Sequence, residues 1–327
     1  MATAADVLDR VEDEPLHAQF RRDVLAGLSR AQKAIPARWF YDHHGSELFE
    51  QITELAEYYP TRTEIGILAE HCPEIGQVVG AGRVVVEFGA GSATKTPLLL
   101  DCIAPAGYVP IDISGDFLRE SCTPLQARYP ALPIHPVEAD FGSPAVLPAA
   151  LERHGRLGFF PGSTIGNMEP FAAVDLLRTM RATLGEDSLL LIGMDRIKDE
   201  AVLTAAYDDA MGVTAEFNLN LAHRINRELG GTIPLAALQH RAIWNDDRAR
   251  IEMHLEARHD ITFDVAGHRF TMHAGETIHT ENSHKYDMRS AATLLLAGGW
   301  APLRRWRDAD DAFMVILASA IGEDLTG

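Results

Sequence analysis

The feature that most constrains this chain is an alternation of short apolar runs with longer amphipathic stretches in its middle third. Five runs have the length of buried strands, at residues 83–88, 108–113, 134–139, 157–160 and 188–194. Three stretches of helical length and spacing separate them, at 96–103, 115–129 and 170–184. Strands that alternate with helices form right-handed crossovers and a parallel sheet covered on both faces. We therefore predict an α/β fold with a doubly wound sheet, to which the run 313–318 adds an edge strand.

The flanking regions have a different pattern. Residues 36–60 are dense in aromatic side chains, and Ser46 is placed to cap a helix there, while Thr61 and Glu64 have the spacing of a capping box. The stretch 199–229 is helical in pattern, whereas 243–278 contains short alternating runs typical of antiparallel strands. We expect a second, α+β domain inserted into the core. The expected boundaries are 62–196 and 286–327 for the core, and 1–61 and 197–285 for the second domain.

Charge and composition exclude several classes of partner. The formal net charge of −18 repels phosphate backbones and anionic membrane surfaces, so we expect neither nucleic acid nor a membrane as a partner. No apolar run approaches the length of a membrane span, and the acidic start has no signal-peptide pattern. The three scattered cysteines argue against a disulfide scaffold and suit a reducing compartment. We expect a cytoplasmic monomer.

The end of the first predicted strand carries a glycine turn. Glu87 is followed by Gly89 and Gly91, which let the backbone turn tightly and approach a ligand at the carboxyl edge of a sheet. Thr94 occupies the position where a dinucleotide fingerprint requires its third glycine, and no P-loop lysine stands in register. S-adenosylmethionine (SAM) has no pyrophosphate and needs only one close glycine approach, so this turn favours SAM.

Two acids follow the next two predicted strands. Asp112 can accept hydrogen bonds from ribose hydroxyls, and Asp140 can accept from an adenine amino group whose ring is covered by Phe141. Lys95, near the positive end of the following helix, can pair with the methionyl carboxylate. Together these residues predict a nucleoside-cofactor site composed of Glu87, Gly89, Gly91, Lys95, Asp112, Asp140 and Phe141.

Three segments are more specific than a generic fold. Residues 39–46 read WFYDHHGS, residues 57–62 read EYYPTR, and residues 162–167 read GSTIGN. They closely resemble the L-histidine Nα-methyltransferase family, and the resemblance extends from about residue 36 to the C-terminus. That family trimethylates L-histidine to hercynine on the way to ergothioneine. The resemblance implies a class I (Rossmann-like) SAM methyltransferase core with an inserted substrate-binding domain.

The resemblance also implies which residues make contacts. The family's cofactor contacts correspond to Gly89, Lys95, Asp112, Asp140 and Phe141. Its substrate contacts correspond to Tyr41, Tyr58, Gly162, Asn167, Tyr207, Met253, Glu281 and Ser283. The chain departs from the family pattern at His43, His44, Met194, Asn282, Ser283, His284 and Tyr286.

The residues carried over at the reacting end of the substrate are Tyr41, Gly162, Asn167 and Tyr207. Asn167 and Tyr207 are assigned to the carboxylate of histidine, and the Gly162 carbonyl and Tyr41 to its amino group. An ammonium has no lone pair and repels a sulfonium, so the amine must bind in its neutral form. Its ordinary pKa of about 7.7–8.0 makes a strong general base unnecessary. Alignment can supply much of the acceleration.

The remaining contacts are assigned to the imidazole ring. Glu281 and Ser283 are two residues apart, so on an extended segment they face the same side. A carboxylate accepts from one ring nitrogen, and a hydroxyl donates to the other. Tyr58 completes that contact, and Met253 lines the ring pocket. The expected substrates are L-histidine and its mono- and dimethyl forms.

Three other functions remain open on the sequence. The acceptor could be another aromatic amino acid, such as a tryptophan derivative, although an indole has no second nitrogen for Glu281. The chain could be a non-catalytic SAM-binding module, although such a module has no need of a substrate pocket. A nicotinamide oxidoreductase is disfavoured by Thr94.

The chain is rich in histidine, a common metal ligand. Six of the fourteen lie between residues 254 and 284, but without the H-E-x-x-H spacing of a helical zinc site. On short strands we expect these side chains to scatter across both faces. We therefore predict no metal site.

Overall fold

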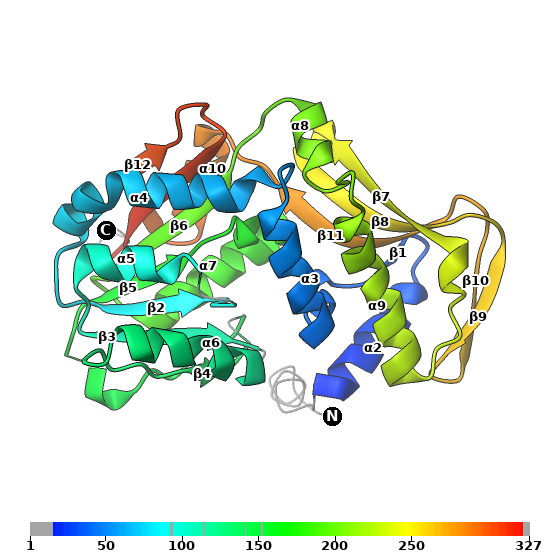
Figure 1. Ribbon diagram of the computed structural model, residues 1–327, viewed down its shortest axis with the longest axis horizontal. Helices are drawn as coiled ribbons and strands as arrows, with labels where there is room; N and C mark the ends of the chain where they lie inside the picture. The colour runs from blue at the N-terminus through cyan, green and yellow to red at the C-terminus, as the bar shows by residue number, and fades with distance from the viewer. Residues whose placement is uncertain (1–15, 92–93, 114, 141, 152, 323–327) are drawn as a thin grey trace. The chain divides into compact units, whose positions relative to one another are not determined.

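The structure of the protein is a computed structural model that describes residues 16–91, 94–113, 115–140, 142–151 and 153–322. The chain divides into two compact units, which we describe separately (Figure 1). The larger unit comprises Glu50–Ala206, Trp244–Ile251 and Asn282–Gly327. The smaller unit comprises Met1–Phe49, Tyr207–Ile243 and Glu252–Glu281.

The larger unit is built on a seven-stranded sheet, and the predicted doubly wound α/β class is confirmed. From one edge to the other the strands are β12 (Trp300–Arg307), β13 (Phe313–Ala320), β6 (Leu189–Asp195), β5 (Arg156–Phe160), β2 (Val84–Phe88), β3 (Gly107–Asp112) and β4 (Val137–Glu138). The strands from β6 to β4 are parallel, and β13 is antiparallel to both of its neighbours. Since β2 pairs with both β3 and β5, the strand order reverses at β2. Ligands of doubly wound sheets bind at the carboxyl end of such a switch point.

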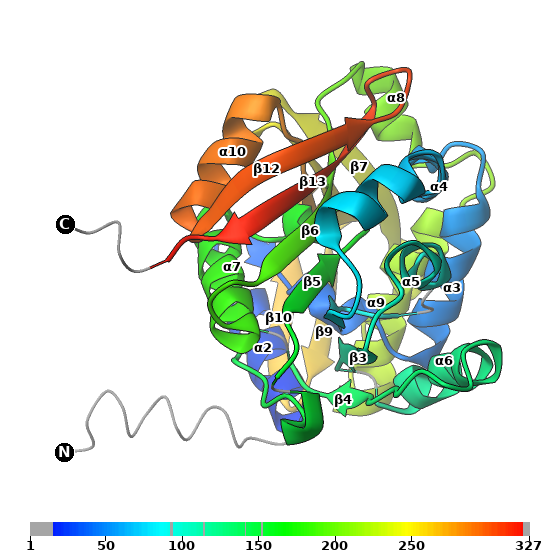
Figure 2. The same cartoon turned by 90° about the vertical axis from the view of Figure 1, so that its left-hand side faces the viewer.

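Helices cover both faces of this sheet, as Figure 2 shows. On one face lie α7 (Pro170–Leu184) and α10 (Met288–Ala297), and on the other α4 (Tyr59–Val79) and α5 (Thr96–Ile103), while α6 (Gly115–Arg128) follows β3. Val84 and Val86 pack into the α7–α10 core, whereas Val85 packs into the α4–α5 core. The unbroken apolar run of β2 therefore reflects burial on both faces.

Two details of the sheet differ from the sequence prediction. The run that begins at Phe313 is not an edge strand, because β12 pairs on its outer side. Pro302 and the charged pair Arg304 and Arg305 make β12 typical of a sheet edge. The predicted strand 134–139 is reduced to β4, with one isolated bridge from Ile134 to Tyr108.

The smaller unit combines a four-stranded sheet with helices. Its strand order is β1 (Lys33–Ala34), β11 (Thr277–His284), β8 (Arg250–Ala257) and β7 (Leu238–Asn245), and a separate hairpin is formed by β9 (Ile261–Val265) and β10 (His268–Met272). Its helices are α2 (Leu16–Leu28), the first part of α3 (His43–Glu54) and α9 (Val213–Leu229). Phe40 of a short 3-10 turn packs on Phe217 of α9 with ring centroids 4.5 Å apart. Both rings are buried, which explains the aromatic density of this segment.

The unit boundaries lie elsewhere than the predicted domain boundaries. Residues 50–61 and 197–206 belong to the larger unit. Two of these residues bind Asp195 at the end of β6: the Tyr59 hydroxyl lies 2.7 Å from its carboxylate, and the Lys198 ammonium lies 2.6 Å from it. Short α8 (Glu200–Ala205) follows in the same unit.

The two predicted helix caps are wrong. Helix α3 begins at His43, and the Asp42 carboxylate accepts from the N–H of Gly45 at 2.8 Å, so Ser46 lies inside the helix. Helix α4 begins at Tyr59, so Thr61 is also inside, and the Glu64 carboxylate is used elsewhere. Asp42 thus supplies the side-chain cap of α3 in place of Ser46, and Pro60 lies in the first turn of α4, where proline is favoured.

The cysteine prediction also needs correction. Cys72 of α4 and Cys102 of α5 form a disulfide with their Cα atoms 5.2 Å apart, and Cys122 is a buried free thiol. The two helices pack side by side, which brings together cysteines that looked scattered in the sequence. Among the described residues no helix is both long and apolar enough to cross a bilayer.

Candidate functional site

The glycine turn after β2 has the backbone geometry that its sequence predicts. Gly89 and Gly91 have φ values of 71° and 45°, which side chains with a Cβ rarely adopt. The N–H of Gly89 donates to the carbonyl of Ile111 at 2.9 Å, and the N–H of Gly91 donates to the Asp112 carboxylate at 3.2 Å. The turn is thereby attached to the carboxyl end of β3.

The two acids assigned to the nucleoside lie at neighbouring strand ends. Asp112, which is half-buried, is the last residue of β3 and pairs in register with Glu138 of β4. Asp140 follows β4, is exposed, and accepts from the N–H of Gly142 at 2.9 Å. Phe141 lies outside the described residues. The carboxyl edge of the sheet therefore carries two carboxylates beside the glycine turn.

This arrangement fits the nucleoside part of SAM. Among the described residues, the atom nearest to the point where a Cβ of Gly91 would stand is the Gly89 carbonyl oxygen, 3.9 Å away. Asp112 faces the glycine turn, and Asp140 follows the adjacent parallel strand. A carboxylate at the end of the second strand of a doubly wound sheet is the usual acceptor for ribose hydroxyls.

Lys95 has a partner that the sequence did not suggest. Its ammonium lies 2.5 Å from the carboxylate of Glu64, which is fully buried in α4. The same Glu64 oxygen accepts from the N–H of Gly162 at 2.8 Å. Glu64 thus joins α4, the start of α5 and the loop after β5. The ammonium has three hydrogens, so it can donate to Glu64 and to the methionyl carboxylate at the same time, as the predicted contact requires.

Glu87 is occupied inside the core. One carboxylate oxygen accepts from the Thr96 and Tyr108 hydroxyls, each at 2.7 Å. Burial raises the pKa of this carboxyl to about 7, although both hydroxyls lower it in part. The structure therefore shows Glu87 as the link between β2, β3 and the start of α5, and its predicted cofactor contact stays a prediction.

The loop 162–167 is shaped by two left-handed residues. Gly162 and Ser163 have φ values of 80° and 56°, and a 3-10 turn, Thr164–Asn167, follows. A Cβ at Gly166 would lie 2.8 Å from the carbonyl oxygen of His284, so this loop packs directly against the end of β11. The half-buried Asn167 is therefore held near the strand that carries Ser283.

A buried network connects that loop to Ser283. The Ser163 hydroxyl accepts from the N–H of Asp195 at 2.9 Å. The Asp195 carboxylate pairs with the Lys285 ammonium at 2.7 Å, and Lys285 donates to the Ser283 hydroxyl at 2.9 Å. Asp195 and Lys285 are both fully buried, while Tyr58 is largely buried beside Tyr59, which also binds Asp195.

The predicted substrate residues of the smaller unit come from separate elements. Tyr41 packs edge-on against Phe49 and Phe217, with ring centroids 5.7 and 5.8 Å away. Tyr207 is buried, and its carbonyl lies 2.8 Å from a ring nitrogen of His240.

Met253 and Glu281 leave their strands on opposite faces. Glu252 and His254 contact each other and thus share one face of β8, so alternation puts Met253 on the other face. His254 stacks on His279, and Glu281 leaves β11 on the same face as His279. The expectation that Met253 lines the same ring pocket as Glu281 is therefore not supported by the strand geometry. The stacked pair also corrects the expectation that these histidines scatter.

Sequence reasoning missed three residues with central positions: Glu64, Asp195 and Lys285. Glu64 was interpreted as part of a capping box, and Asp195 and Lys285 lie far apart in the chain. Glu64 and Asp195 are charged residues beside apolar runs, which predicts burial with a partner but not which partner, and Lys285 lies in a polar segment that carries no such signal.

Known proteins resemble this chain over almost its whole length. A family model described as histidine-specific, SAM-dependent methyltransferase matches residues 20–320. A histidine N-alpha-methyltransferase of Mycolicibacterium smegmatis is 41% identical over 311 residues, covering 91% of this chain and 94% of that protein. The protein of the same name in Mycobacterium tuberculosis is 38% identical over 320 residues, covering 96% and 98%.

Two further similarities are more distant. An ergothioneine biosynthesis protein 1 of Neurospora crassa is 28% identical over 300 residues, which are 88% of this chain and 33% of that protein. Among solved structures, the 1,6-didemethyltoxoflavin-N1-methyltransferase of Burkholderia thailandensis, with bound S-adenosylhomocysteine, has a TM-score of 0.44 and 11% identity. That alignment covers 86% of this chain and 89% of that one.

Proposed function

Because the chain belongs to the family of histidine-specific, SAM-dependent methyltransferases, we propose that it transfers three methyl groups to the α-amino nitrogen of L-histidine. The product is hercynine, Nα,Nα,Nα-trimethyl-L-histidine, and the reaction is the first step of ergothioneine biosynthesis. The observation that carries this proposal is the near full-length similarity to two histidine N-alpha-methyltransferases. The name of the Neurospora crassa relative supports the pathway.

The residues that would hold SAM are those at the carboxyl edge of the large sheet. Asp112 would accept from the ribose hydroxyls, Asp140 from the adenine amino group, and the turn at Gly89 would allow the close approach of the nucleoside. When bound, SAM supplies an electrophilic methyl group on a positively charged sulfur.

The amino end of histidine needs alignment more than a base. The amine reacts through its lone pair, so only the neutral form is productive, and its ordinary pKa of about 7.7–8.0 already provides a large neutral fraction. The Gly162 carbonyl and Tyr41 would orient this nitrogen, while Asn167 and Tyr207 would hold the carboxylate. The fixed loop around Gly162 supports such a role, because its N–H is bound by the buried Glu64.

The imidazole end explains the choice of acceptor. Lys285 can only donate, so the Ser283 oxygen accepts this hydrogen bond while its own O–H keeps the capacity to donate. A neutral imidazole has one acceptor nitrogen for this hydroxyl and one N–H for the Glu281 carboxylate. The pair would therefore select a ring with two nitrogens and hold it neutral, with Tyr58 completing the contact and Met253 outside the strand face that carries Glu281.

The proposal is tested by mass spectrometry of the purified protein incubated with SAM and a pool of the twenty amino acids. We expect histidine alone to gain up to three methyl groups. Methylation of another amino acid would retain the enzyme class and overturn the acceptor. A histidine product that stops at one or two methyl groups with SAM in excess would overturn trimethylation.

A further inference from the structure

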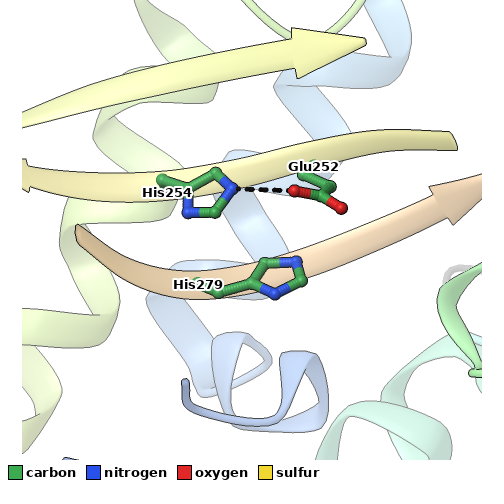
Figure 3. Close-up of side chains that lie close together, drawn as sticks. All are labelled: Glu252, His254 and His279. Carbon is green, nitrogen blue, oxygen red and sulfur yellow. Dashed lines mark hydrogen bonds and ion pairs between the residues drawn. The ribbon is translucent and has the colours of Figure 1, made fainter. Parts of the chain in front are cut away.

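Two histidines and a glutamate of the smaller unit lie together on one face of its sheet. Glu252 and His254 belong to β8, and His279 belongs to the neighbouring strand β11, as Figure 3 shows. The His254 and His279 rings are stacked, with centroids 4.7 Å apart and planes inclined by 18°. Glu252 and His254 are buried, and His279 is half-buried. None of the three belongs to the proposed methyl-transfer machinery.

The polar atoms of these side chains converge. Each residue offers one ligand atom, and the three atoms lie within 4.8 Å of one another. His254 Nε2 is 3.2 Å from a carboxylate oxygen of Glu252. Ligand atoms about 2.0–2.2 Å from a tetrahedral zinc ion are separated by about 3.4 Å. The three atoms are therefore close enough to share one ion once the two rings rotate out of their stack, because an imidazole binds a metal in its ring plane.

The surroundings orient the ligands as metal sites commonly do. The second ring nitrogen of His254, Nδ1, lies 3.2 Å from the Thr277 hydroxyl, which leaves Nε2 directed at Glu252. His279 Nε2 lies 3.0 Å from the carbonyl oxygen of Glu281. A cation held through Nδ1 of His279 would keep this hydrogen bond, and one held through Nε2 would replace it.

The electrostatics also suit a cation. Burial lowers the pKa of His254 below its ordinary value, and the neighbouring His279 ring lowers it further. The Glu252 carboxylate supplies negative charge in a region that burial has removed from water.

We propose that Glu252, His254 and His279 form a binding site for a divalent transition-metal cation such as Zn²⁺. Two imidazoles and one carboxylate favour zinc, cobalt, nickel or copper over the hard cations Mg²⁺ and Ca²⁺, which prefer oxygen ligands alone. Three protein ligands leave one position of a tetrahedral ion for water or another ligand. None of these three ligands has a role in the methyl-transfer proposal, but the cluster adjoins it, because His279 Nε2 contacts the carbonyl of Glu281.

Metal binding is tested on the full chain, without an affinity tag, stripped of metal and free of SAM and histidine. Zn²⁺ is titrated by calorimetry, and Co²⁺ by its visible absorption. We expect one equivalent to bind with a dissociation constant of about 1 µM or below. Binding with a dissociation constant above about 100 µM for both ions would overturn the site.

Variants locate the ion. His254→Gln and His279→Gln should each weaken binding by roughly 100-fold or more, since even the loss of an outer partner costs 10–100-fold. Glu252→Gln keeps the volume and the hydrogen bond to His254, so it should fold normally and still bind weakly. The matched control is His273→Gln, because His273 forms an exposed contact with Asp260 at 3.4 Å.

The His273→Gln control distinguishes metal binding by this cluster from metal binding by exposed histidines. Unchanged binding in His273→Gln, together with loss in the cluster variants, supports the proposal. Loss in His273→Gln, or retention in Glu252→Gln of the wild-type affinity, overturns it. A Zn²⁺-dependent rise in Tm that occurs in the wild type but not in Glu252→Gln gives a second readout that needs no activity.

Discussion

Asp112 and Asp195 end two parallel strands of the same sheet, yet the structure uses them in opposite ways. Asp195, after β6, is fully buried and surrounded by the Lys198 and Lys285 ammoniums and the Tyr59 hydroxyl, at 2.6–2.7 Å. Asp112, after β3, is half-buried and accepts from the backbone of the glycine turn. An acid at a strand end is therefore a ligand candidate only where buried cations do not already neutralise it.

The charges around Asp195 explain why it stays ionised. Burial by itself raises the pKa of its carboxyl, but Lys285 and Lys198 outweigh this effect and hold the pKa below its ordinary value. Burial in turn lowers the pKa of Lys198 to about 8, against the opposing pull of Asp195. The three groups form one structural unit that also positions Ser283.

The largest expected effect comes from Asp195→Asn. The substitution keeps the shape but leaves two buried ammoniums without their counter-charge, which typically costs about 3–5 kcal/mol. Urea unfolding measures the loss. The matched variant Asp112→Asn should stay within about 1 kcal/mol of the wild type. Equal losses in the two variants would remove the distinction between the two strand ends.

Glu87→Gln tests a third carboxylate of the same sheet through pH. The pKa of Glu87 is raised to about 7 by burial, so the folded state binds more protons than the unfolded state between about pH 4.5 and 7. This carboxyl therefore costs the wild type stability as pH rises through that window, and glutamine does not titrate. The variant should gain about 3 kcal/mol relative to the wild type between pH 4.5 and 7, at 1.36 kcal/mol per pKa unit. If the free energies of unfolding of the two proteins changed in parallel with pH, the raised pKa of Glu87 would be contradicted.

Asp112→Ala should weaken SAM binding by at least about 10–100-fold, because it removes a charged acceptor whose hydrogen bonds are worth about 1.5–3 kcal/mol each. Calorimetry measures the affinity, and the KM for histidine should stay unchanged. An intact SAM affinity would show that Asp112 is as structural as Asp195.

Glu281→Ala should give the reverse result, with the KM for histidine raised by about 10-fold or more and SAM affinity unchanged. Steady-state kinetics with each substrate varied in turn provides the comparison. Equal effects on both substrates would exclude Glu281 as the imidazole contact.

The smallest effect is expected at the surface of the same unit. Arg178 and Asp175 of α7 form an exposed ion pair at 3.4 Å. Arg178→Gln should change the free energy of unfolding by less than about 0.5 kcal/mol. A larger change would mean that an exposed ion pair also stabilises this unit. Burial would then not explain why the ion pairs of Asp195 are expected to matter for stability.

Much of the fold follows from local sequence pattern. The predicted helices 96–103 and 170–184 agree with α5 and α7, and the apolar runs at 83–88 and 188–194 with β2 and β6 to within a residue. The helices are amphipathic and the two strands are unbroken apolar runs, so burial of one face or of both determines them. The predicted helix starts at Ser46 and Thr61 are wrong because Asp42 caps α3 and Pro60 opens the first turn of α4.

By itself the sequence determined the alternation of strands and helices, the glycine turn and the order of acids along the carboxyl edge, because these depend on neighbours in the chain. Only the tertiary structure decided that Glu64 meets Lys95, that Lys285 meets Asp195 and that His254 stacks on His279. Such pairs depend on strand register and helix packing between distant segments. Each pair affects stability because its two side chains are buried next to each other, and no local sequence pattern encodes which residues become neighbours.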